Sequence, residues 1–493
     1  MKKRLSPRLI AALLLTALLA SCGEGATSTD TTTSESDTET TPVETEITPD
    51  LPDKDWSGRE FRVLGYAAPT YTQFSNFEID TEAENGEVVN DAIFRRNAAI
   101  EDRYNVEIVQ TLDSSETEGQ QATTPVIRKL VLANEDAYDL VFLPVGSCGT
   151  VVREKLLYNL NAVDYIDMEH PWWNQTVRED LEIDGKLFLA ASDFSLRDKN
   201  RAYIMTVNLD LLDDFDLQHP VELVRDGTWT LDVFNSYATT VAGDLNGNGE
   251  VDPEDRFGYG IDSANGFAAL VYGGDVKLLE NENGTLVPNT NTEHTVDVID
   301  KVLEVFSQKN IAYWPKDWKK SNAENNTISS EIAYAGRVLF RTSFTHSLQS
   351  YSANATSDYA IIPFPKYDEE QDGYYSYADP YGMLFGIPIT TPEPEFAGFM
   401  LEALSYEATE TSLNAYYEVA CKTKYTYDPD SAEMLDLIFD GIRYEPAVVY
   451  KIRGNDLISK NCESRKNSFV TSFASTESAM LADLEKLMED ISD

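Results

Sequence analysis

FRVLGY (61–66) opens the part of this 493-residue chain that decides its fold, because this apolar strand begins a regular alternation. Apolar residues recur at helical spacing over 90–104, and VEIV (106–109) follows as an alternating strand. A second helix is expected over 124–134, with a proline in its first turn, and YDLVFL (138–143) is a fully apolar strand. This β-α-β-α-β order predicts an α/β fold in which helices bury a parallel sheet on both faces.

Two loops follow strands of this predicted sheet. In open α/β sheets, ligands bind outside the carboxyl ends of the strands. Tyr66 ends the first strand, and Gly146 and Ser147 lie in the loop PVGS (144–147) after the third. These three residues are therefore candidates for contact with a ligand.

Further strands and helices are expected along the rest of the chain. The later strands are KLFLAA (186–191), AYIMTVN (202–208), RVLFR (337–341) and YAIIPFP (359–365). Helices over 295–309 and 476–490 each gather apolar residues on one face, which indicates packing against a core.

The first 22 residues have the pattern of an export signal. A basic start precedes the apolar run LIAALLLTALLA (9–20), which is too short to span a membrane as a stable helix. The small residues of LASC (19–22) resemble the lipobox of bacterial lipoproteins, so we expect acylation of Cys22; the alternative is an ordinary secretory signal that ends nearby. No second long apolar run exists, so the mature chain is expected to be anchored to a membrane without spanning it.

Residues 23–55 consist largely of Thr, Ser, Glu and Asp, and they contain almost no apolar side chains. Such a segment cannot bury a core, so we expect a disordered, acidic tether. The whole chain is also acidic, with 39 Lys and Arg against 85 Asp and Glu, a formal net charge of −46. This charge repels nucleic acid and argues against a role in binding DNA or RNA.

Three cysteines remain beyond the signal segment: Cys148, Cys421 and Cys462. Their spacing matches no zinc motif. A disulfide between Cys421 and Cys462 is one possibility, and the odd number leaves at least one thiol unpaired within the chain.

The stretch GDLNGNGEVDPEDRFG (243–258) has the register of a calcium-binding loop. Oxygen-bearing side chains occupy positions 1, 3, 5, 7, 9 and 12 of a twelve-residue EF-hand loop, with a glycine at position 6 and Val251 at position 8 as an expected core contact. Position 12 is Asp instead of the bidentate Glu, as in the dockerin variant, and the alternative interpretation is a polar turn. The expected ligands of a structural Ca²⁺ are Asp244, Asn246, Asn248, Glu250, Asp252 and Asp255.

Six segments, in their order and spacing, resemble the extracellular solute-binding proteins of ABC importers, particularly the family with sugar-binding members. They are LLYNLNAVDYIDMEHPWWNQ (156–175), DGKLFLAASDFS (184–195), MTVNLDLLDDF (205–215), GTWTLDVF (227–234), GRVLFRTSFTHSLQSY (336–351) and IIPFPKYDEEQDGYYSYADPYGMLFGIPITT (361–391). The resemblance covers nearly the whole chain, and the calcium-like loop also occurs in a subgroup of that family.

This resemblance implies a two-lobed, periplasmic-binding-protein-like fold of type II, with hinge segments that cross between the lobes. The first lobe would comprise 56–192 and 343–405, and the second lobe 193–342 and 406–493. A solute, by expectation a carbohydrate or oligosaccharide, would bind in the cleft, and closure would present the protein to ABC permease subunits. We expect a monomer on the outer face of the cell membrane, held there by its lipid.

Saccharides bind through aromatic rings and through hydrogen bonds to polar side chains. The resemblance adds Trp229 and Tyr381 to Tyr66 as candidate rings, and it adds polar candidates near the crossing segments: Asp193, Arg341, Thr342, Ser343 and Asp379. Trp172 and Trp173 have a structural alternative as a core wedge at the edge of a lobe.

Two other functions stay open at the level of sequence: an exported lipoprotein glycoside hydrolase and a surface glycan-binding protein. A hydrolase needs two facing carboxylates, which a chain with 85 acidic residues can supply. The four histidines are scattered, and no HExxH, G-x-S-x-G, P-loop or G-x-G-x-x-G motif occurs. GSCG (146–149) is the nearest approach to a nucleophile loop and has no recognisable partner histidine, so we expect no enzymatic activity.

Overall fold

The computed structural model describes residues 47–68, 75–113, 122–289, 292–318, 320–424 and 430–492. The expected signal and most of the expected tether lie outside these residues, and so does Cys22. None of the described helices is both long and apolar enough to cross a membrane.

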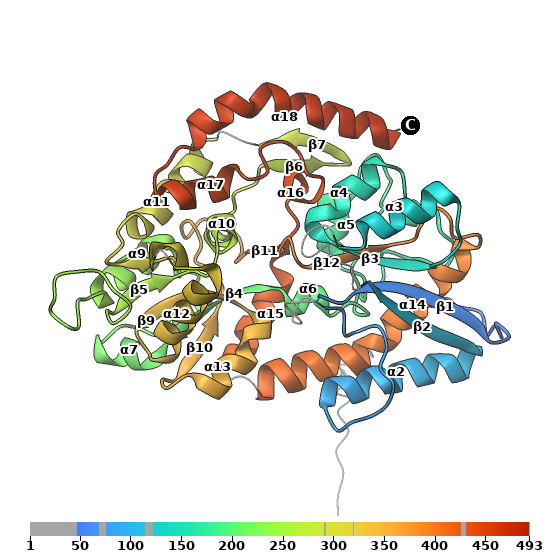
Figure 1. Cartoon of the computed structure of the whole chain (residues 1–493), viewed down its shortest axis with the longest axis horizontal. Coiled ribbons are helices and arrows are strands. Elements are labelled where there is room, and N and C mark those ends of the chain that lie inside the picture. Colours follow the sequence, from blue (N-terminus) through green and yellow to red (C-terminus); the bar gives the residue numbers. More distant parts are fainter. Residues whose placement is uncertain are drawn as a thin grey trace, which may run out of the picture. The chain divides into compact units, whose positions relative to one another are not determined.

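The first lobe is built on a four-stranded sheet in the order β12-β3-β1-β2 (Figure 1). β1 pairs in parallel with β2 and β3, and β12 is antiparallel to β3, so the predicted parallel β-α-β-α-β unit is confirmed. Its elements are β1 (Arg59–Tyr66), α2 (Val88–Tyr104), β2 (Val106–Asp113), α3 (Thr124–Ala133), β3 (Leu140–Pro144), α4 (Val145–Arg153), α5 (Gln175–Leu181), β12 (Met383–Gly386) and α14 (Pro394–Ala408).

The second lobe is built on a five-stranded mixed sheet in the order β10-β4-β9-β5-β8. Its strands are β4 (Tyr203–Asn208), β5 (Phe257–Gly260), β8 (Ala312–Tyr313), β9 (Val338–Phe344) and β10 (Tyr359–Ile362). Its helices are α7 (Leu209–Asp214), α8 (Pro220–Arg225), α9 (Leu231–Val241), α10 (Ala264–Gly273), α11 (Glu293–Phe306), α12 (Asn322–Tyr334), α13 (Leu348–Asn354) and α17 (Leu457–Ser464).

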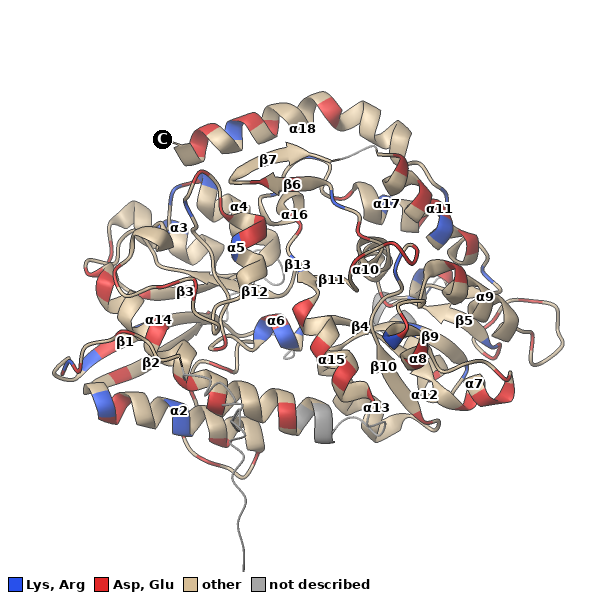
Figure 2. Ribbon diagram, turned by 180° about the vertical axis from the view of Figure 1, so that it is seen from behind, with Lys and Arg blue, Asp and Glu red and all other residues tan. Residues whose placement is uncertain are grey.

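The remaining elements lie between the two sheets or run from one to the other. They are α6 (Arg197–Asn200), β6 (Leu279–Glu282), β7 (Thr285–Pro288), β11 (Ser376–Tyr377), π-helical segments over Thr409–Leu413 and Ala415–Lys424, α15 (Ser431–Asp440), β13 (Ile442–Arg443), α16 (Pro446–Val449) and α18 (Phe469–Ser492). Figure 2 marks acidic residues on helices of both lobes, and α6, at the crossing, contains Arg197 and Lys199 beside Asp198.

The predicted lobe boundaries are wrong in one part. β10 pairs antiparallel with β4, so residues from Ser343 to the end of β10 belong to the second sheet, and the return to the first lobe comes only with β12. The reason is that a strand joins whichever sheet offers it an edge, which its own apolar pattern does not specify. The predicted strand over 186–191 is also wrong, because this segment makes only isolated bridges, such as Ala190 with Phe385.

The C-terminal segment connects the two lobes. α18 packs on α17 of the second lobe and on α4 of the first, and it runs above the β6–β7 hairpin (Figure 1). Arg153 of α4 forms an ion pair with Asp483, and the Lys186 ammonium donates to the carbonyl of Ile491 at 2.5 Å. The prediction that residues 406–493 belong to the second lobe alone is therefore wrong.

Candidate functional site

A buried ion pair marks the centre of the interlobe region. The guanidinium of Arg201, which follows α6, bonds the carboxylate of Asp379 with Nε–Oδ2 at 2.7 Å, and the two side chains are 4% and 1% exposed. The same guanidinium lies 2.7 Å from Nε2 of His346. Burial and the positive charges of Arg201 and Arg197 hold the pKa of His346 well below its usual range, so this imidazole accepts the hydrogen bond in its neutral form.

Five aromatic rings form a row past this ion pair. Tyr272 stacks on Tyr377 at 4.6 Å between centroids, and Tyr377 is nearly parallel to Tyr203 at 6.2 Å. Tyr203 lies 4.3 Å from Phe344, and Phe344 stacks on His346 at 5.3 Å. The row joins two cavities, since Tyr272 and Tyr377 line one of them and His346 lines the other.

The first of these, here called the tyrosine cavity, is bounded by α5 of the first lobe and by α10, β6 and the segment after β13. Four tyrosines line it: Tyr272, Tyr375, Tyr377 and Tyr444. Its polar lining comprises Glu179, Asp180, Asp275, Lys277, Glu280, Asn281, Arg443 and Glu445. Aromatic surface with a few converging polar groups is the usual lining of a small-molecule site.

Two carboxyl groups of the tyrosine cavity are strongly affected by burial. Burial raises the pKa of Asp180 to about 6 and that of Glu445 to about 7. Backbone N–H groups oppose this change: Tyr444 donates to Asp180 at 2.8 Å, and Leu278 donates to Glu445 at 2.9 Å. Glu445 therefore joins the start of α16 to the segment that enters β6.

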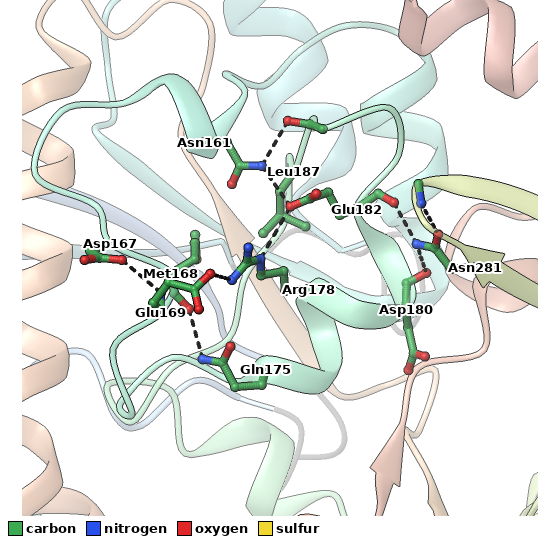
Figure 3. Close-up of polar contacts among 12 residues, drawn as sticks. Asn161, Asp167, Met168, Glu169, Gln175, Arg178, Asp180, Glu182, Leu187 and Asn281 are labelled. Carbon is green, nitrogen blue, oxygen red and sulfur yellow. Dashed lines mark hydrogen bonds and ion pairs between the residues drawn. The ribbon is translucent and has the colours of Figure 1, made fainter.

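The β6–β7 hairpin, from the second lobe's half of the sequence, lines the tyrosine cavity together with α5, and Figure 3 shows its Asn281 pointing toward Asp180 and Glu182. The amide of Asn281 donates to the carbonyl of Glu182 at 2.7 Å and to that of Asp180 at 3.4 Å. The backbone N–H of Asp184 donates to the carbonyl of Gly284 at 3.0 Å. These contacts bridge the lobes directly over the cavity.

The second cavity, here called the histidine cavity, contains His346 in its lining. It also lies between the lobes, because Phe77 and the first turns of α2 form one side, whereas Thr345, His346 and Gln349 form the other. Phe77 follows β1 and Thr345 follows β9, whereas Tyr66, Gly146 and Ser147, predicted as ligand contacts at strand ends, are not part of its lining.

Several predicted ligand residues lie around this interlobe centre. Asp379 holds Arg201, and Tyr381 follows it, partly exposed. The backbone N–H of Gly146 donates to the carbonyl of Pro380 at 2.9 Å, and Ser147 donates to the carbonyl of Pro144. Asp193 lies on the first crossing segment, where burial raises its pKa to about 6 and Thr409 donates to it at 2.7 Å.

Other predicted ligand residues are buried inside the lobes. Trp229 is fully buried, donates to the carbonyl of Pro363 and packs on Phe340, so its expected place in the cleft is wrong. Its apolar neighbours in the strand-and-helix layer bury it, which spacing along the chain does not reveal.

Partner side chains hold Arg341 and Thr342 of β9, and Ser343 and the end of β1 are also buried. Arg341 bonds Asp262 and Tyr351, and the Thr342 hydroxyl lies 2.7 Å from that of Tyr259. Ser343 and Tyr66 are each 1% exposed. None of these side chains lies on an open surface.

Sequence reasoning missed Tyr272, Tyr377 and Tyr444 as members of the site. Tyr377 lies within a segment quoted for the family resemblance, but Tyr272 ends an apolar helix and Tyr444 follows a two-residue strand. No local pattern brings these segments together.

Two sequence features have structural roles. The indole N–H groups of Trp172 and Trp173 both donate to the buried carboxylate of Glu402, which makes this pair a core wedge. In GSCG, Cys148 is fully buried, and a Cβ at Gly149 would lie 2.4 Å from the backbone of Tyr450. This motif therefore allows α4 and α16 to approach closely, and it does not expose a nucleophile.

The three cysteines among the described residues are unpaired. Cys148, Cys421 and Cys462 are buried thiols, so the possible disulfide between the last two is absent.

The calcium-like loop folds around its own carboxylates. Asp244 accepts the N–H groups of Gly247 and Gly249, whose φ angles are +71° and +75°. Asp255 is 5% exposed and accepts from Leu245 and Asp252. The expected core contact of Val251 is wrong, because this side chain is 42% exposed.

The side chains of the loop offer oxygen atoms, which are the metal ligands that Ca²⁺ prefers. Here the amides of Asn246 and Asn248 donate to Asp252 while their oxygens accept backbone N–H groups. Within the described ranges, no group of three or more His, Cys, Asp or Glu side chains is arranged to hold a metal ion.

The fold has counterparts among solved structures, although no family model and no curated protein matches the sequence. The galacto-N-biose-/lacto-N-biose I-binding protein of an ABC transporter from Bifidobacterium longum, in complex with lacto-N-biose, is similar with a TM-score of 0.57 at 11% identity, over 88% of this chain and 99% of that one. An open conformation of a sugar transporter protein from Rhizobium etli is similar with a TM-score of 0.54 at 14% identity, over 88% of this chain and 99% of that one.

An ABC substrate-binding protein from Listeria monocytogenes, in complex with cycloalternan, gives a TM-score of 0.52 at 12% identity over the same shares. The likeness extends over almost the full length of each of these proteins. The chain therefore has the two-lobed α/β fold of the solute-binding proteins to which these sugar-binding members of ABC transporters belong.

Proposed function

We propose that this chain is a solute-binding protein that captures a saccharide between its two lobes and delivers it to an ABC permease. The observation that supports this most strongly is the tyrosine cavity, which both lobes form together within a fold shared with saccharide complexes. Tyrosine rings offer apolar faces, and the carboxylates, Asn281 and Arg443 offer acceptors and donors for hydroxyl groups. We place the ligand along the ring row between the two cavities, near Asp193, Asp379 and Tyr381.

Binding requires a route into the cavity. The β6–β7 hairpin bridges to α5 directly over the tyrosine cavity, so release of the Asn281 contacts is the opening step in this proposal. Hinge closure after entry would restore them and present a defined surface to the permease.

The experiment is a thermal-shift screen of the protein lacking residues 1–22 against a glycan and small-solute library, followed by calorimetry on the hits. A ligand that binds only the folded state raises the melting temperature. Small-angle scattering with the hit should show compaction, and chromatography should show the ligand unchanged. Turnover of the hit would instead favour the hydrolase alternative.

The proposal includes lipid anchoring at Cys22 on the outer face of the membrane, and a monomeric protein. It also includes a structural calcium ion at the 244–255 loop. The support for calcium is the register of oxygen-bearing side chains and the backbone turn around Asp244. An ion there would neutralise carboxylates of an already acidic chain.

A further inference from the structure

The tyrosine cavity carries an excess of negative charge. Five carboxyl groups line it (Glu179, Asp180, Asp275, Glu280 and Glu445), against two cationic side chains. Burial raises the pKa of Glu445 to about 7, so this group is largely protonated at pH 6.5, and the negative charge rests on the other four. Of the two cationic side chains, the Lys277 ammonium lies 3.3 Å from Glu280, and the Arg443 guanidinium lies 4.6 Å from the ring centroid of Tyr375. A neutral ligand would leave this imbalance uncompensated.

Tyr444, which lines both this cavity and a small pocket beside Asp198, carries a buried hydroxyl without a partner among the described residues. Tyr444 is 1% exposed. A buried polar group without a partner destabilises the protein, and a hydrogen bond to a ligand would remove this cost. The rings of Tyr272 and Tyr377 line the same space, and aromatic faces attract cations.

We propose that the tyrosine cavity binds a primary ammonium group, so that the captured saccharide carries a free amine. This inference rests on the proposed saccharide-binding function and adds the charge of the ligand. An ammonium donates three hydrogen bonds and accepts none, which suits a lining rich in carboxylates and tyrosine oxygens. Two sources share this chemistry, an amino sugar and a linear polyamine, and the observations favour the sugar because the cavity also offers Asn281 and Arg443 to hydroxyl groups.

Calorimetry at pH 6.5 with matched tetrasaccharides tests this inference. The probes are a glucosamine tetramer, its fully N-acetylated form, cellotetraose and spermidine. We expect the glucosamine tetramer to bind at least tenfold more tightly than the two neutral tetramers. Equal binding of all three would overturn the ammonium inference and leave saccharide binding intact.

The other outcomes separate the two proposals. Binding of spermidine alone would support recognition of an ammonium group and overturn the proposal that the ligand is a saccharide. Binding of none of the four probes would overturn the ammonium inference, while the broader glycan screen would still test saccharide capture.

Paired variants test whether the preference for the amine arises from carboxylates of the tyrosine cavity. Asp275→Asn with Glu280→Gln removes two partly exposed carboxylates of the cavity, and Glu485→Gln with Glu489→Gln removes two exposed ones on α18. The first pair should reduce the preference for the amine to below threefold, whereas the control pair should keep it. If the double cavity variant fails to fold, Asp275→Asn and Glu280→Gln are measured singly. An unchanged preference for the amine in folded cavity variants would overturn the assignment of the ammonium group to the tyrosine cavity.

Discussion

The buried pair of Arg201 and Asp379 should contribute strongly to the stability of the interlobe region. Their atoms lie 2.7 Å apart, and at an effective dielectric constant of about 20 the Coulomb attraction is about 6 kcal/mol before desolvation is subtracted. Removing one partner from a buried pair typically costs about 3–5 kcal/mol, because the other charge stays buried without compensation. We therefore expect Asp379→Asn to lower the unfolding free energy by about 3 kcal/mol, and Arg201→Met to do the same.

A double-mutant cycle in urea unfolding measures this coupling. The unfolding free energy should fall clearly less in the double variant than the sum of its decreases in the two single variants. The coupling energy should be about 2 kcal/mol or more. The matched control is the pair of Arg128 and Glu154, whose side chains are 40% and 38% exposed. Changing that surface pair to Met and Gln should give a coupling of about 0.5 kcal/mol or less. A coupling below about 1 kcal/mol for the buried pair would refute the reasoning.

Four other features give measurable expectations. Asn281→Ala removes the two hydrogen bonds from the hairpin to Asp180 and Glu182, together with one inside the hairpin turn from the N–H of Gly284. It should increase the ligand's dissociation rate about fivefold, whereas Thr285→Ala on the same hairpin should not; equal rates would contradict the opening step. Burial raises the pKa of Glu445 from 4.5 to about 7, so its stabilising contribution is present at low pH and is lost as the pH rises through 7. From pH 4.5 to pH 8 the wild type should therefore lose about 3 kcal/mol of unfolding free energy relative to Glu445→Gln, and parallel pH profiles would count against this. Calcium added to chelated protein should raise the melting temperature, and Asp244→Ala should abolish that rise; no response in the wild type would exclude the calcium site. Cys22→Ser should move the protein from the membrane to the soluble fraction, and retained lipid on the variant would disprove acylation at that residue.

The local pattern of the sequence determined the first lobe's core. FRVLGY and YDLVFL are apolar on both faces, and only a strand covered on both sides by helices buries such a run, so their parallel pairing could be predicted. The same reasoning held for the helices over Val88–Tyr104 and Glu293–Phe306, where the apolar residues recur at helical spacing.

The tertiary structure alone decided which residues meet between the lobes. Tyr272, Tyr377 and Tyr444 come from three segments separated along the chain, and an aromatic residue has the same local pattern whether it faces a cavity or a core. Trp229 shows the converse, because the family resemblance made this ring a candidate ligand contact, whereas it is fully buried. Sequence periodicity reports which side of a strand or helix is buried, whereas a binding site depends on which elements pack together, and long-range packing sets that.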